Sequence, residues 1–135
     1  MRSSVILLSL LISGWANALT LSPMYKDDLV YQDLYMAKFK LENNGADLQE
    51  YDVSLHKESP EGEILYTSED VLGGDGYKSL SVPIYDIKPD KLQKYYICVT
   101  EKPKENQKWG VVGRACAKVR LYWPQSQLRQ LAQQD

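Results

Sequence analysis

Few of the side chains that carry enzyme chemistry occur in this chain. It has one histidine, His56, and two cysteines, Cys98 and Cys116. We expect His56 to be a solvated surface side chain, and no motif around it suggests a Ser-His-Asp arrangement. Two thiolates and one imidazole also leave a zinc site short of ligands. We therefore predict that the protein is not an enzyme and that it holds no metal and no cofactor.

Motifs for phosphate or nucleic-acid binding are also missing. The glycine-rich stretch at residues 73–76 lacks the Lys-Ser/Thr pair and the helix of a P-loop, so we interpret it as a turn. The formal net charge is −2 at pH 7 and no basic run occurs. Because basic patches drive binding to nucleic acid, we predict no nucleic-acid partner.

The one long apolar run lies at the start of the chain. Arg2 precedes the apolar residues 5–12, a run shorter than the roughly 20 residues of a membrane-spanning helix. Ala16, Asn17 and Ala18 have the small-x-small pattern of a signal-peptidase site. We expect residues 1–18 to be a signal peptide, with an N-terminal membrane anchor as the alternative. Export then places the mature chain, of net charge −3, in the periplasm or outside the cell, without membrane insertion.

The mature sequence alternates between apolar and polar residues, which is typical of half-buried strands. About seven short strands separated by turns, without a convincing amphipathic helix, predict an all-β chain folded as a β-sandwich. Pro83 interrupts one of these strands and should stand on a sheet edge, because proline cannot donate to the ladder. Only the polar tail, residues 125–135, has helix-forming composition.

The last two strands are the most clearly defined. Residues 94–100 and 114–123 flank a polar loop, and the midpoint between Cys98 and Cys116 falls on Gln107, inside that loop. An antiparallel hairpin centred there sets the two cysteines opposite each other, close enough for a disulfide. A redox site is less consistent with this spacing, because no Cys-x-x-Cys motif is present.

Alternation along the hairpin also assigns its two faces. One face is apolar and should lie in the core, and it comprises Tyr95, Ile97, Val99, Val119 and Leu121. The other face carries Tyr96, Lys118 and Arg120. A slip of one residue in the register would invert all of these assignments.

Several segments resemble the N-terminal domain of PapD-like periplasmic chaperones of chaperone–usher pili. Residues 91–103 are similar to the penultimate strand of that domain, and residues 118–124 (KVRLYWP) to its closing strand. Residues 39–43, 51–55 and 75–82 follow in the same order and spacing. The resemblance implies an immunoglobulin-like sandwich over residues 19–124. A disulfide between the last two strands also occurs in a subgroup of these chaperones.

The resemblance further implies a client, namely an exported protein or a pilus subunit. In the family a basic pair of the chaperone holds the carboxylate at the end of the subunit. The closing strand of the chaperone donates apolar side chains to the unfinished sandwich of the subunit. Arg120 matches the anchor in the closing strand, with Lys118 beside it, and the anchor of the first strand falls one position from Lys26. The donor positions fall on Val111, Gly113 and Ala115.

A second resemblance carries a different function. The Tyr96-x-Cys98 segment is similar to the tyrosine-corner region of immunoglobulin and fibronectin type III domains. The alternative to a chaperone is therefore a secreted adhesion or structural module without a client.

Overall fold

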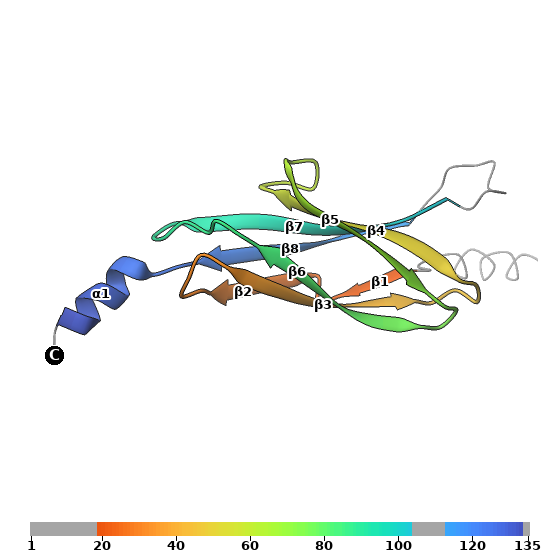
Figure 1. Ribbon diagram of the computed structural model, residues 1–135, viewed down its shortest axis with the longest axis horizontal. Coiled ribbons are helices and arrows are strands. Elements are labelled where there is room, and N and C mark those ends of the chain that lie inside the picture. The colour runs from red at the N-terminus through yellow and green to blue at the C-terminus, as the bar shows by residue number, and fades with distance from the viewer. Residues whose placement is uncertain (1–18, 104–112, 134–135) are drawn as a thin grey trace, which may run out of the picture.

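The structure is a computed structural model that describes residues 19–103 and 113–133. It has eight strands, arranged in a three-stranded sheet, β1-β3-β6, and a five-stranded sheet, β2-β8-β7-β4-β5 (Figure 1). The strands are β1 (Leu19–Ser22), β2 (Tyr25–Leu29), β3 (Tyr35–Asn43), β4 (Gln49–Lys57), β5 (Ile64–Leu72), β6 (Tyr77–Ile84), β7 (Leu92–Glu101) and β8 (Arg114–Tyr122). The predicted β-sandwich is confirmed. The expected signal peptide lies outside the described residues.

The first part of the chain contributes to both sheets. β1 pairs antiparallel with β3, and after Pro23, which follows a cis peptide bond, β2 pairs parallel with β8. Proline cannot donate a backbone hydrogen bond, so it suits the point where the chain leaves one ladder for the other. This crossing produces one strand more than the alternation pattern predicts.

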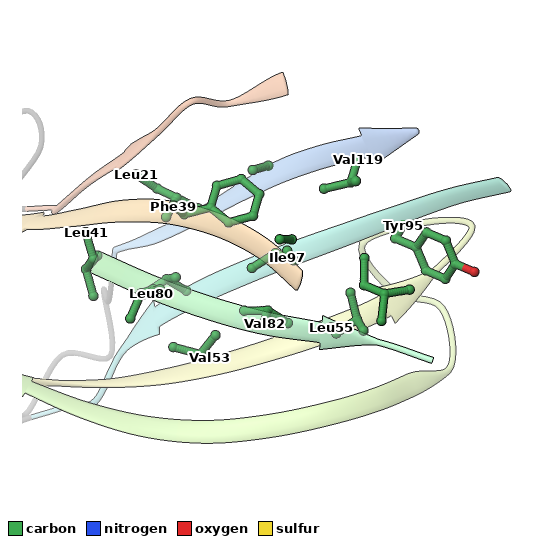
Figure 2. Close-up of a cluster of buried hydrophobic side chains, with 14 of the residues drawn as sticks. Leu21, Phe39, Leu41, Val53, Leu55, Leu80, Val82, Tyr95, Ile97 and Val119 are labelled. Atoms are coloured by element: carbon green, nitrogen blue, oxygen red, sulfur yellow. The ribbon is translucent and has the colours of Figure 1, made fainter. Parts of the chain in front are cut away.

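The core lies between the sheets, where the inward side chains of the strands meet (Figure 2). Period-two alternation places one side chain in two on this face, as in β3, where Ala37, Phe39 and Leu41 are buried. Each leucine or isoleucine removed from water in this way stabilises the fold by about 1.5–3 kcal/mol. The same alternation leaves Lys38 and Lys40 exposed, so the pattern defines the two faces of the strand.

The β7–β8 hairpin has the predicted register. Cys98 lies opposite Cys116 and forms a disulfide with it, with the two Cα atoms 4.0 Å apart. The predicted face assignment is confirmed as well, because the five apolar residues of the hairpin are buried, while Tyr96, Lys118 and Arg120 lie half-buried on the opposite face. Pro83 stands in β6, at an edge of the three-stranded sheet, as predicted.

A short helix, α1 (Gln125–Gln133), follows the last strand. None of its residues is buried. Within residues 19–103 and 113–133, no helix is long and apolar enough to span a membrane.

Candidate protein-binding site

The outer edge of β8 is covered over only part of its length. β2 pairs with residues 118–122 of β8, and no described strand pairs with residues 114–117 on that side. Residues 114–117 lack this pairing because the chain crosses between the sheets at Pro23. The residues before Pro23 belong to the other sheet. An unpaired strand edge offers N–H and C=O groups to another chain.

One hydrogen bond of β8 shows which of its backbone N–H and C=O groups point away from β7, toward the β2 side. The N–H of Lys118 donates to the carbonyl of Met24, at 2.9 Å. Backbone groups of successive residues in a strand point to alternate sides, so those of Arg114 and Cys116 also point to the β2 side. The part of the edge that β2 leaves open therefore presents the N–H and C=O of these two residues.

The side chains of the open edge that face the core are small. Ala117 is buried, and Ala115 is partly buried against the core. Of the other expected client-binding residues, Val111 lies outside the described residues. The described part of the edge thus offers backbone groups flanked by methyl groups rather than bulky aliphatic side chains.

Lys26 and Arg120 lie on opposite sides of the β2–β8 ladder. Lys26 pairs with the buried Val119, and its ammonium group lies 5.3 Å from the centre of the Phe39 ring, on the core side. Among the described residues, no carboxylate forms an ion pair with Lys26. The family resemblance implies two cations in one carboxylate site, but the sheet separates these two.

The guanidinium group of Arg120 is already engaged within the chain. Its Nε and one Nη donate to the two carboxylate oxygens of Asp27, at 3.0 and 2.5 Å. Tyr25 donates its hydroxyl to the same carboxylate, at 2.9 Å, and its ring lies 5.4 Å from the guanidinium carbon. The hydrogen bonds from Arg120 hold the pKa of Asp27 below its usual value. This cluster exists because the parallel β2–β8 register sets Asp27 opposite Arg120.

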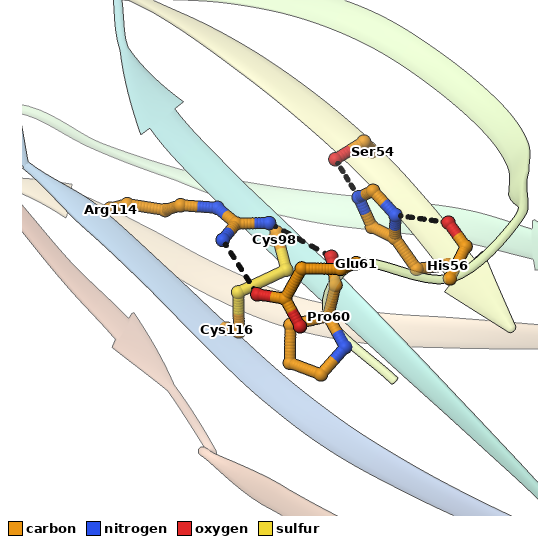
Figure 3. The surroundings of a disulfide bond; sticks show 8 residues. Ser54, His56, Pro60, Glu61, Cys98, Arg114 and Cys116 are labelled. Atoms are coloured by element: carbon orange, nitrogen blue, oxygen red, sulfur yellow. Dashed lines mark hydrogen bonds and ion pairs between the residues drawn. A yellow bond between two sulfur atoms is a disulfide. The ribbon is translucent and has the colours of Figure 1, made fainter. Parts of the chain in front are cut away.

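His56 does not occupy the solvated position expected from the alternation pattern, and that expectation is wrong. The side chain is only 6% exposed, because the turn between β4 and β5 folds back beside it (Figure 3). Nδ1 lies 3.1 Å from the carbonyl oxygen of Gly62, and Nε2 lies 2.7 Å from the Ser54 hydroxyl. A carbonyl only accepts, so Nδ1 carries the proton, and in the neutral ring Nε2 accepts from Ser54.

The same turn is held beside the disulfide. Arg114 donates to the carbonyl of Pro60, at 3.0 Å, and forms an ion pair with Glu61, at 3.7 Å (Figure 3). Through its contact with Gly62, His56 also helps to hold the β4–β5 turn in place, which is a structural role. Within the part of the chain that the structure describes, no group of histidine, cysteine and acidic residues could hold a metal ion.

Comparison with known proteins relates the chain to others by fold. No family model and no curated protein matches its sequence. The structure of the E. coli chaperone DraB matches with a TM-score of 0.61 and 14% identity, covering 78% of this chain and 55% of DraB. The chain has the fold of PapD-like chaperones.

Two further structures show the range of this fold. A chaperone–tip adhesin complex of CFA/I fimbriae matches with a TM-score of 0.58 and 14% identity, over 80% of this chain and 57% of the matched chain. A PapD-like domain of human CEP192 matches with a TM-score of 0.54 and 9% identity, over 78% of this chain and 84% of that domain. The chain thus spans little more than half the length of the matched pilus chaperone chains.

Proposed function

We propose that the protein is a periplasmic, chaperone-like binding protein that adds a strand of an exported protein or pilus subunit to the open edge of β8. The observation that carries the proposal is the partial coverage of β8, whose residues 114–117 have no hydrogen-bonded partner strand on the β2 side among the described strands. The fold shared with DraB and with the chaperone of a chaperone–tip adhesin complex supports this function.

Strand addition explains how such an edge binds protein without catalytic groups. The backbone groups of Arg114 and Cys116 pair with an extended client segment, and main-chain hydrogen bonds supply the affinity. Ala115 and Val111 contact the client at the donor positions. Small side chains there suit a client whose groove is shallow or filled by its own bulky residues.

A cation near the edge binds a carboxylate of the client, and which cation does so depends on the face that the client reaches. Lys26 is available for this role, because no described carboxylate is paired with it. Lys118 and Arg120 serve a client that reaches the outer face, where its carboxylate competes with Asp27 for the guanidinium group. Charge-assisted hydrogen bonds of this kind are about twice as strong as neutral ones.

The second candidate function is a secreted adhesion or structural module without a client. The match to a domain of human CEP192 favours it, because the same fold occurs there outside pilus chaperones. A chaperone binds an unassembled exported protein stoichiometrically, whereas a structural module does not.

The decisive experiment changes one backbone group of the edge. Arg114→Pro removes an N–H that points away from β7, so the β7–β8 ladder keeps its hydrogen bonds. Arg114→Ala is the matched control, since it also loses the contacts to Pro60 and Glu61 but retains the N–H.

Each tagged variant is expressed in the native host, and the exported proteins that copurify are quantified by mass spectrometry. We expect one client to copurify with wild type and Arg114→Ala and to be lost with Arg114→Pro. Equal capture by both variants would exclude strand addition at this edge, and no stoichiometric client with wild type would favour the structural module.

A further inference from the structure

The helix α1 gains no stability from burial in its own chain. It has nine residues, none of them buried. A helix this short is marginal in water unless an apolar face is packed against something. Its start is fixed, because Asp90 accepts hydrogen bonds from the backbone N–H and the hydroxyl of Ser126, at 2.9 and 2.6 Å. The rest of α1 extends beyond the ends of the strands (Figure 1).

One face of α1 is apolar. Leu128 and Leu131 lie three positions apart, so they point to the same side of the helix. Leu131 is 62% exposed. These two leucines need a cover that the described chain does not provide.

An apolar row on the outer face of the five-stranded sheet is also uncovered. It consists of Leu29, Tyr122 and Leu92, which lie opposite one another on β2, β8 and β7. Leu29 is 58% exposed and Leu92 is 51% exposed. An outer sheet face normally carries polar residues, so a row of this kind is typical of a contact surface. Its central residue, Tyr122, lies three positions before Gln125, the first residue of α1.

We propose that the protein forms a two-fold dimer in which α1 of each copy lies across the apolar row of the other copy. The dimensions agree, because three helical residues rise about 4.5 Å and adjacent strands lie about 4.8 Å apart. Leu128 and Leu131 can therefore pack over neighbouring strands. The exchange is reciprocal, which closes the assembly at two copies.

Charge complementarity supports a second copy as the occupant. The last turn of α1 contains no basic residue, so the partial negative charge of its terminal carbonyl groups is not matched within the helix. Lys94 lies on β7, two residues after Leu92 and on the same outer face, opposite Arg120. In the dimer, Lys94 of one copy faces the carboxyl-terminal end of α1 from the other.

The test is sedimentation equilibrium of the purified protein at concentrations up to about 0.5 mM. We expect wild type to form dimers, and Leu131→Gln and Leu29→Ser each to weaken the dimer by about tenfold or more, because every substitution removes two symmetry-related contacts. Ile64→Ser is the matched control, since Ile64 is also 58% exposed and stands on β5, at the opposite edge of the same sheet. It should leave the dimer unchanged.

Two outcomes would overturn the proposal. One is a wild-type protein that stays monomeric over the whole range. The other is a dimer that persists in Leu131→Gln and Leu29→Ser, since association then uses another surface. Arg114→Pro separates this interface from the β8 edge, because it should abolish client capture without changing the dimer.

Discussion

Removing the disulfide should lower the stability of the domain without changing its fold. The double substitution Cys98→Ala with Cys116→Ala opens a loop whose ends are 18 positions apart. Cross-linking a loop of this size stabilises a protein by about 3 kcal/mol, because it restricts the unfolded chain. The nine residue pairs that join β7 to β8 remain, so the hairpin should keep its register.

Urea unfolding followed by tyrosine and tryptophan fluorescence measures this effect. We expect a lower midpoint together with a steeper dependence on urea, since an unfolded chain without the cross-link exposes more surface. Reduced wild-type protein is the control and should lose a similar free energy of unfolding. A loss under about 1 kcal/mol would refute the reasoning that the disulfide acts on the unfolded chain. A much larger loss in the double variant than on reduction would show that packing of the buried Cys98 dominates.

Three further predictions test the core, the Asp27 cluster and the β4–β5 turn. Leu121→Ala should cost about 2–5 kcal/mol of unfolding free energy and Lys118→Ala at most about 0.5 kcal/mol; similar values in urea would show that the faces are misassigned. Arg120→Ala should raise the pKa of Asp27 toward its ordinary 3.8 in an NMR titration. In wild type, the stabilisation from this ion pair should be lost as the pH falls below that value. An unchanged pKa of Asp27 in the variant would mean that the pair does not form in solution. Gly62→Ala should lower the melting temperature, because its methyl group would overlap a backbone carbonyl of β4; an unchanged value would show that the turn adapts.

Local patterns predict the parts of this fold that depend on neighbouring residues. Alternation assigns Ile97 and Leu121 to the core because a strand side chain can face only one of two sides. The cysteine register follows from the same geometry, since an antiparallel hairpin is symmetric about its loop. Both predictions concern residues close enough in the sequence to share one supersecondary unit.

The parts that the sequence does not predict depend on distant pairings. Asp27 meets Arg120 across 93 positions, through a parallel pairing that no local pattern indicates. The division of the first strand at Pro23 cannot be predicted for the same reason, because its two parts pair with different, distant strands. His56 occupies a polar position of its strand, and only the three-dimensional path of the following turn buries it. A glycine six residues after the histidine was the one signal that could have suggested a close approach of the turn.

Amide hydrogen exchange at the edge of β8 tests the account most directly. The measurement compares the free protein with its complex with the copurified client, one residue at a time. We predict that the N–H groups of Arg114 and Cys116 exchange much more slowly in the complex, whereas the N–H of Lys118, already bonded to Met24, changes little. A bound client that leaves Arg114 and Cys116 unprotected would contradict strand addition at this edge.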